Sequence, residues 1–315
     1  MKNVKVILIG VALCATVFAN ARIEALGGDA GFWSGDRANA AIFPGTLNDG
    51  SWVEFGGVEG DPSASINWDN DGTKWGMNFD AAGNNDWVNM SWAKDGMGLS
   101  VGFTSASDGA GTDASGFDVA WGKDMSFGEL GVGYSSADDG SGGDAVTNLW
   151  ANWRGDLGFW VFDQAKADFS MGDNDMSLGF DLFTHVTPAD GVDVLVAWGF
   201  GYASTTEDHA DGEGSAMWLP NALVAAEAAM TDWATVRAFV SQDHKMTCDD
   251  GGVDCATGNS TDYGFGVGFG WQATNGSSIN LDMEVSNSLF TDPIGSMSGH
   301  SGSFNDGAVT LSYTF

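Results

Sequence analysis

Two Asp-His pairs come closest to catalytic chemistry in this sequence, because a carboxylate beside an imidazole is the arrangement of a general base. They are Asp208-His209 and Asp243-His244, and both fall in stretches expected to be loops. In a chain with 43 acidic residues, such dipeptides arise readily by chance. No serine stands in a recognisable nucleophile motif, and no further polar pattern accompanies the pairs. We therefore predict that the protein is not an enzyme.

Cys248 and Cys255 form a close pair in a glycine-containing stretch. In an oxidising compartment two neighbouring thiols most simply form a disulfide, and we predict that bond here. The alternative is a metal site, which would need more soft ligands than these thiols and the nearby carboxylates supply.

The stretch from Asn67 to Gly72 partly matches the start of a calcium loop, with oxygen ligands at alternate positions and glycine at the sixth. The twelfth position is Asn78, where such loops carry a bidentate glutamate. Asp71-Gly72 is typical of a hairpin turn, and we predict a turn here. No cofactor or dedicated metal site is expected. Weak binding of divalent cations by the acidic outer loops together stays an alternative.

Residues 1–21 have the pattern of a secretory signal peptide. A short basic start precedes an apolar stretch at 6–18, and Ala19-Asn20-Ala21 is an A-x-A cleavage site. We predict export by the Sec pathway and a mature chain that begins at Arg22. The apolar stretch is too short to span a bilayer as a helix. A lipoprotein would need Cys14 as the lipidated residue, and the leucine before it is too large for that motif.

The chain is strongly acidic, with 11 Lys and Arg against 43 Asp and Glu. Cleavage of the signal peptide removes two of the lysines and leaves 9 basic residues, for a formal net charge of −34. This sign excludes nucleic acid as a partner. Two interpretations remain: an acidic surface solvated in a saline medium, or a lumen that attracts cations and repels anions.

From Ser51 onward, apolar and polar residues alternate with a period of two, which is typical of strands with two different faces. The alternation is clearest at 63–69, 74–80, 97–104, 263–271 and 279–285. Aromatic residues recur at strand ends, and the other face is rich in Gly, Ser, Asn and Asp. These features favour a lipid-facing apolar surface around a crowded or watery lumen. A soluble sandwich or propeller would turn its apolar face inward.

No segment after the signal peptide has about 18 consecutive apolar residues, so no transmembrane helix is predicted. A closed barrel is the other structure that satisfies the backbone in lipid. We expect about 16 strands over residues 51–315, beginning near 51, 63, 73, 86, 96, 115, 126, 145, 157, 175, 191, 216, 232, 261, 277 and 307. Fourteen strands are the main alternative, because the patterns near 51 and 157 are weak.

The connections alternate between short and long, which is typical of an outer-membrane barrel. The short set is expected in the periplasm, at 70–72, 94–95, 124–125, 154–156, 185–190, 230–231 and 273–276. The long set, expected outside the cell, includes 105–114, 136–144, 204–215, 242–260 and 287–306. Bulky residues on the polar face are candidates to fill a narrow bore: Trp52, Trp87, Trp150, Trp160 and Phe183.

The last residues, 307–315, form the predicted closing strand, with Tyr313 and Phe315 on its apolar face. This strand resembles the C-terminal signal of bacterial outer-membrane proteins, in which a terminal aromatic residue is read by the barrel-assembly machinery. We therefore predict an all-β, transmembrane, antiparallel up-and-down barrel of the Gram-negative outer membrane. Its expected partners are the assembly machinery and outer-membrane lipid. The sequence leaves the oligomeric state open, homo-oligomers included.

Residues 22–50 do not alternate, and we predict a compact plug inside the barrel. Ala25-Leu-Gly-Gly28 and Ile42-Phe-Pro-Gly45 resemble the start of the long-chain fatty-acid transporter superfamily, which includes the shuttle barrels of type IX secretion. The second run keeps Pro44 but lacks the preceding asparagine. The resemblance implies a hatch in the periplasmic half of a fourteen-strand barrel. Candidate plug residues are Arg22, Glu24, Arg37 and Pro44.

A second patch is similar to a hairpin of the same superfamily. Leu219 to Glu227 and Asp232 to Ala238 match its P-x-x-x-x-x-G-x-E and W-x-x-x-R-x-G pattern, with alanine at the glycine positions. Glu227 and Arg237 lie symmetrically about Asp232, so a tight turn there makes them cross-strand neighbours. An arginine in a barrel wall avoids lipid, so both are expected to face the lumen and pair. Structural neutralisation of charge and a constriction charge are the two interpretations.

The leading hypothesis is an outer-membrane channel or transporter for the passive passage of small solutes, hydrophobic ones included, through a lumen that disfavours anions. The alternative is a non-transporting barrel: a scaffold, an adhesin or a secretion partner that presents its acidic loops.

Overall fold

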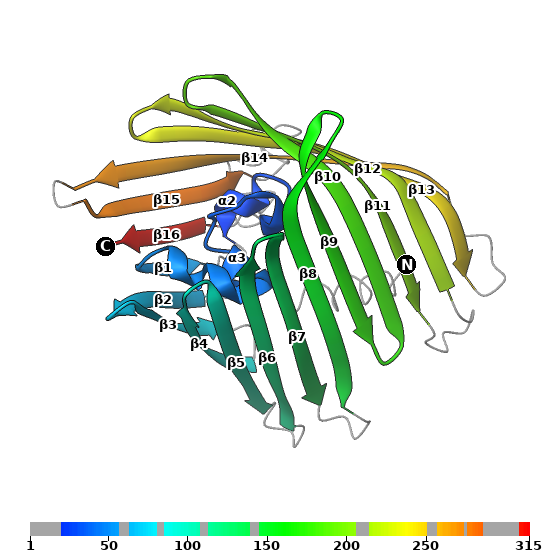
Figure 1. Ribbon diagram of the computed structural model, residues 1–315, viewed down its shortest axis with the longest axis horizontal. Coiled ribbons are helices and arrows are strands. Elements are labelled where there is room, and N and C mark those ends of the chain that lie inside the picture. The colour runs from blue at the N-terminus through cyan, green and yellow to red at the C-terminus, as the bar shows by residue number, and fades with distance from the viewer. Residues whose placement is uncertain are drawn as a thin grey trace, which may run out of the picture.

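The computed structural model describes residues 20–56, 63–80, 85–107, 113–138, 145–205, 214–250, 257–273, 276–285 and 309–315. Over these residues the chain forms one closed barrel of sixteen antiparallel strands, with four short helical segments inside it (Figure 1). The prediction of an up-and-down barrel with sixteen strands is confirmed, and the alternative of fourteen is wrong. Among the described residues, no helix is long and apolar enough to cross a membrane.

The strands follow the chain in order. Their bounds are β1 Trp52–Gly56, β2 Ser63–Asn70, β3 Thr73–Asp80, β4 Asn85–Lys94, β5 Met97–Ser107, β6 Asp113–Met125, β7 Gly128–Asp138, β8 Val146–Phe159, β9 Phe162–Gly172, β10 Asp175–Ala189, β11 Val192–Thr205, β12 Gly214–Thr231, β13 Ala234–Asp250, β14 Gly258–Gln272, β15 Ser278–Val285 and β16 Val309–Thr314.

The last strand closes the barrel. β16 pairs with β15 on one side and with β1 on the other, where Trp52 lies opposite Thr314. The backbone N–H of Phe315 extends this seam by donating to the carbonyl of Ser51 at 3.0 Å. Closure gives every spanning strand two neighbours, which is what a backbone in lipid requires.

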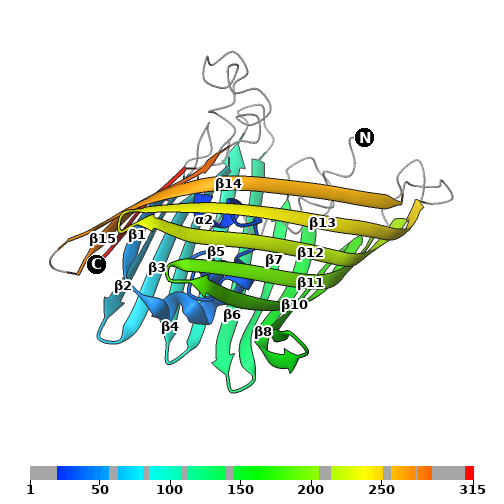
Figure 2. The same ribbon diagram turned by 90° about the horizontal axis from the view of Figure 1, so that it is seen from above.

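The two faces of the wall differ as the alternation predicts. Large apolar side chains such as Phe103 and Phe55 are exposed on the outer surface, whereas inward-facing Asn67, Asn78 and Asn89 are buried. The long strands β11 to β14 lie side by side along one flank (Figure 2). They form the wall against which much of the N-terminal segment packs.

Four expected turn positions are wrong. The turns expected at 124–125 and 230–231 lie two residues later, at 126–127 and 232–233. Strand β8 continues to Phe159 and turns at Trp160 and Val161, beyond the expected 154–156, because the apolar run from Leu157 allows pairing to resume after a register shift. The next short turn, expected at 185–190, lies at 190–191, because β10 continues to Ala189.

Of the residues expected to fill the bore, three are buried: Trp52, Trp150 and Phe183. Trp160 is 86% exposed in its turn, with φ at 57°, so its assignment to the lumen is wrong. The register shift before the turn removed it from the alternating pattern that assigned it. The side chain of Trp87 lies outside the described residues.

We expect Phe315→Ala to lower the fraction of protein that reaches the outer membrane as a folded, heat-modifiable barrel. The substitution removes the stacking of Phe315 on Tyr313 at the seam between the first and last strands. Phe55→Ala, an exposed apolar position on the neighbouring strand, is the matched control. Equal folded fractions for the two variants in gel-shift assays would contradict a special role for the terminal residue.

Candidate functional site

The candidate site is the segment 20–50 inside the barrel, here called the hatch, together with the wall residues that hold it. It contains α2 Ala21–Glu24, η2 Ala30–Phe32, α3 Asn39–Ile42 and η3 Pro44–Asp49 (Figure 1). The helices are short because glycines and a proline interrupt them. Gly27 and Gly28 follow α2 with φ of 105° and 79°, a left-handed backbone that favours glycine.

One side of the hatch forms an apolar core with the wall. Ile23, Leu26, Phe32 and Trp33 of the hatch pack against inward-facing residues of β10, β11 and β12, which are Phe183, Leu195, Ala197 and Ala225. The rings of Phe32 and Phe183 meet edge to face with centroids 5.3 Å apart. An apolar cluster of this kind holds its members in place by burial. Part of the lumen is therefore filled by packed side chains.

The other side of the hatch lies on a track of glycines. A Cβ atom at Gly98 would overlap the carbonyl of Pro44, one at Gly122 would meet the proline ring at 2.7 Å, and one at Gly131 would overlap the carbonyl of Ile42. The hatch backbone thus rests directly on the backbones of β5, β6 and β7. Pro44, predicted as a plug residue from its motif, lies at the centre of this contact.

Arg154 of β8 binds the hatch from the wall. Its guanidinium donates to the carbonyl of Gly31 at 2.9 Å and to Oδ1 of Asn39 at 3.0 Å, and it pairs with Glu129 of β7. It also lies 4.8 Å from the ring centre of Phe43. The arginine is almost fully buried, so its charge depends on these partners.

Lys166 of β9 makes a second ionic contact. Its Nζ lies 2.7 Å from Asp29 of the hatch, 2.9 Å from Asp181 of β10 and 3.6 Å from Asp168 of its own strand. The ammonium also lies 4.5 Å from the ring centre of Phe32. One cation therefore balances three carboxylates, one of which belongs to the hatch.

Glu227 and Arg237 lie opposite each other on β12 and β13, and the guanidinium donates to the carboxylate. Two partners extend the pair in ways that the sequence did not reveal. Arg22 of the hatch donates to Glu227 at 3.0 Å and pairs with Asp36, and Arg237 donates to Asp282 of β15 at 2.7 Å. These partners are distant in sequence, so spacing carries no signal for them. The pair belongs to a network that spans the hatch and three strands.

The remaining hatch arginine, Arg37, reaches the seam of the barrel. It pairs with Glu54 of β1 at 3.3 Å, donates to Thr314 of β16 and lies 5.5 Å from the ring centre of Trp52. Arg37 thereby connects the hatch to both strands that close the barrel.

His185 of β10 also connects the wall to the hatch. Nε2 lies 2.8 Å from the carbonyl of Phe32, and Nδ1 lies 3.0 Å from Oδ2 of Asp193 on β11. Both partners are acceptors, and only the imidazolium form donates from both nitrogens. The ring therefore completes both hydrogen bonds when it is doubly protonated.

The distribution of charge inside the barrel is uneven. Of the nine basic residues after the predicted signal peptide, four make the hatch contacts, Arg22, Arg37, Arg154 and Lys166, and a fifth, Arg237, shares Glu227 with Arg22. Farther from the two-residue turns, inward positions of the wall carry carboxylates, including Asp118, Asp243 and Asp262. The basic residues thus lie mostly where the hatch is held, each paired with carboxylates there, and further carboxylates line the wall beyond the hatch.

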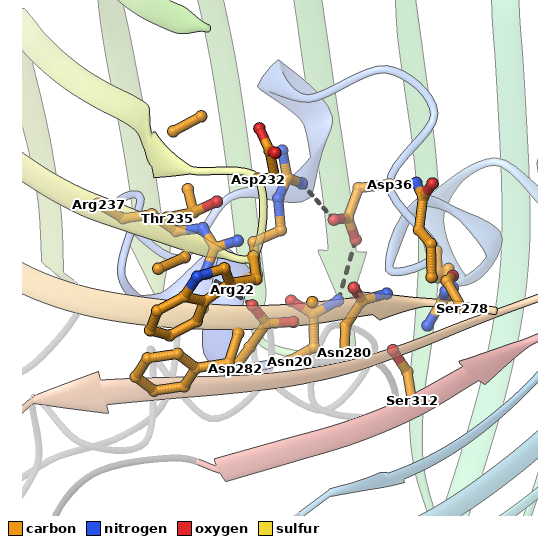
Figure 3. A pocket seen from close by; sticks show the side chains of 18 of the residues that line it. Asn20, Arg22, Asp36, Asp232, Thr235, Arg237, Ser278, Asn280, Asp282 and Ser312 are labelled. Atoms are coloured by element: carbon orange, nitrogen blue, oxygen red, sulfur yellow. Dashed lines mark hydrogen bonds and ion pairs between the residues drawn. The ribbon is translucent and has the colours of Figure 1, made fainter.

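A cavity of about 860 Å³ opens between the hatch and strands β12 to β16, and we call it the vestibule. Figure 3 shows Arg22, Asp36 and Arg237 around it, with Asp282, Asn280 and Ser312 on the neighbouring strands β15 and β16. Its lining is charged and polar. Solute reaching this side of the hatch would meet fixed ions and hydrogen-bonding groups.

Glu24 differs from the other charged hatch residues. Burial raises the pKa of its carboxyl, and the neighbouring carboxylate of Glu284 on β15 raises it further. Ionised Glu24 therefore opposes docking of the hatch, whereas the arginines of the hatch favour it.

The remaining residues singled out in the sequence lie partly outside the described residues. Cys255, the side chain of Cys248, and His209 lie outside the described residues. His244 bonds to Asn259 across β13 and β14. Asn67, the first position of the partial calcium-loop match, donates from its amide to the carbonyls of Leu47 and Gly50 in the hatch. Within the described ranges, no three His, Cys, Asp or Glu side chains gather as metal ligands.

No protein-family model matches the chain, and no curated protein matches it in sequence. Solved structures do resemble it. A bacterial polysaccharide outer membrane secretin is 10% identical with a TM-score of 0.52, over 84% of this chain and 98% of that one. A FadL homologue of Pseudomonas aeruginosa is 10% identical, with a TM-score of 0.37 over 94% and 98% of the two chains. The toluene transporter TodX of Pseudomonas putida is 11% identical, with 0.38 over 93% and 96%. At these identities the likeness is one of fold, that of an outer-membrane β-barrel.

We expect the double substitution of Gly98 and Gly122 by alanine to displace the hatch, because both new methyl groups would occupy the space of Pro44. The measurement is hydrogen–deuterium exchange of hatch peptides, which should become faster while the wall strands stay protected. Gly270→Ala is the control, since its methyl group would meet only the side chain of Asn280. Unchanged hatch exchange in the double variant would show that the glycine track does not hold the hatch.

Lys166→Met should destabilise the docked hatch by about 1.5–3 kcal/mol, the usual contribution of hydrogen bonds to a charged group, because Asp29 is partly exposed to the lumen. The three carboxylates around Lys166 would then lack their cation. Adding Asp181→Asn should restore part of the protection of the hatch, and exposed Lys94→Met should have no effect. A loss of protection that the second substitution does not reduce would argue against the ionic explanation.

Glu24→Gln should slow hatch exchange at neutral pH. The pKa of Glu24 is raised in the folded protein, so its ionisation weakens docking as the pH rises through that pKa, and docking is strongest where the acid is protonated. The difference between the variant and the parent protein should therefore disappear at low pH. A difference that persists in acid would point to a packing effect of the amide.

Proposed function

We propose that this protein is a passive outer-membrane channel for small solutes, whose conductance is limited by the hatch and whose lumen disfavours anions. The observation that carries the proposal is the acidic inward wall beyond the hatch. Most basic residues are paired with carboxylates at the hatch, whereas carboxylates continue along the wall beyond it.

An acidic lumen acts on permeating ions before they reach the hatch. Carboxylates lining a low-dielectric passage raise the local concentration of cations and lower that of anions. The lining of the vestibule is likewise polar, with Arg22 paired to Asp36 and Arg237 paired to Asp282 (Figure 3). These surfaces favour small polar or cationic solutes over hydrophobic ones.

The hatch is suited to partial or complete opening because its contacts are of two kinds. Ionic contacts, such as Lys166 with Asp29, weaken when a charge is neutralised or screened. The apolar core around Phe32 and Phe183 is indifferent to such changes.

Planar-bilayer recording tests the proposal directly. The refolded protein should give stepwise currents with a reversal potential that indicates cation preference. Deleting residues 22–50 should raise the single-channel conductance. A sealed bilayer with well-folded protein would contradict the channel and favour a non-transporting barrel.

Selectivity should depend on the lumen carboxylates. Replacing Asp118, Asp243 and Asp262 together by asparagine should shift the reversal potential toward zero, because the acidic positions beyond the hatch would lose their charge. Asp190→Asn, in a two-residue turn outside the lumen, is the matched control. A reversal potential that both variants leave unchanged would mean that selectivity does not come from these side chains.

A further inference from the structure

The hatch begins with two residues that are integral to its structure, Asn20 and Ala21. Asn20 is 5% exposed and Ala21 is fully buried. Oδ1 of Asn20 accepts a hydrogen bond from the backbone N–H of Ile23 at 2.9 Å and thereby caps α2. The amide of the same side chain donates to Asp36 at 3.0 Å, as Figure 3 shows.

The backbone groups of these two residues also form hydrogen bonds. The carbonyl of Asn20 accepts from the N–H groups of Ile23 and Glu24, and that of Ala21 accepts from Ala25. The N–H of Ala21 donates to Oγ1 of Thr310 on β16, at 2.9 Å. A mature chain that started at Arg22 would lose all of these bonds and leave Thr310 and Asp36 without these partners.

From these contacts we propose that signal peptidase cuts after Ala19 and that the mature protein begins at Asn20. This is two residues earlier than the A-x-A pattern alone predicts. Val17-Phe18-Ala19 presents an alanine directly before the cut and a small, uncharged valine two residues farther back. The sequence therefore offers a second acceptable site, and the folded contacts distinguish it from the first.

The position of the new α-ammonium group agrees with this start. Asn20 lines the vestibule, where Asp36, Glu54 and Asp282 supply negative charge and the cavity has room for water.

The test is the N-terminus of the full-length protein, exported and purified from the outer membrane of a Gram-negative host. N-terminal sequencing should read Asn-Ala-Arg-Ile-Glu, and the intact mass should agree. A sequence that begins Arg-Ile-Glu would overturn the proposal. So would a retained leader on folded protein.

Two substitutions in the precursor separate the sites without depending on the fold. Val17→Phe keeps the leader apolar but replaces the small residue that a cut after Ala19 requires, so it should slow processing in a pulse-chase experiment. Ala21→Leu alters the residue before the later cut and should leave processing unchanged. The reverse pattern would assign the cut to Ala21.

The contribution of Asn20 and Ala21 to the docked hatch can be measured whichever bond the peptidase cuts. Two mature chains, beginning at Asn20 and at Arg22, are refolded and compared by hydrogen–deuterium exchange. The chain from Asn20 should protect the peptide around α2 more strongly. Equal protection would show that Asn20 and Ala21 do not stabilise the hatch.

Discussion

The structure depends on one constraint: the backbone of a chain in lipid must form all its hydrogen bonds within the protein. The sixteen strands meet this constraint only because β16 finds β1 across the whole length of the chain. Closure also creates a lumen, and polar residues of every strand turn toward it. The hatch lies in that lumen and contacts the same seam, since Arg37 reaches both Glu54 and Thr314.

Positively charged residues are few in this acidic chain. The wall contributes Arg154 and Lys166 to the contacts that hold the hatch, and Arg237 pairs with the Glu227 that binds Arg22. Each of the three is buried and paired with carboxylates or carbonyls. A buried cation without such partners would be costly. The carboxylates around each cation are therefore as necessary to the docked hatch as the cations themselves. The wall carboxylates beyond the hatch are those that we propose act on solutes.

Glycine has a different role on each side of the lumen. At Gly98, Gly122 and Gly131 the missing side chain lets the hatch backbone lie against the wall. At Gly179 and Gly199 it leaves space for the carboxylates of Asp168 and Asp181, which pair with Lys166. The same residue type thus supports docking in one place by close approach and in another by making room for charge.

The sequence by itself determined the barrel, its sixteen strands and the pairing of Glu227 with Arg237, because period-two alternation and symmetry about a turn are local properties of the chain. It also placed a plug before Ser51. Only the tertiary structure decided which wall residues hold that plug. Arg154, Lys166 and His185 lie more than 100 positions from their hatch partners, and Trp160 left the lumen through a register shift that alternation does not report. Contacts inside a closed barrel join residues that share no spacing, so their partners emerge only when the strands are arranged around the lumen.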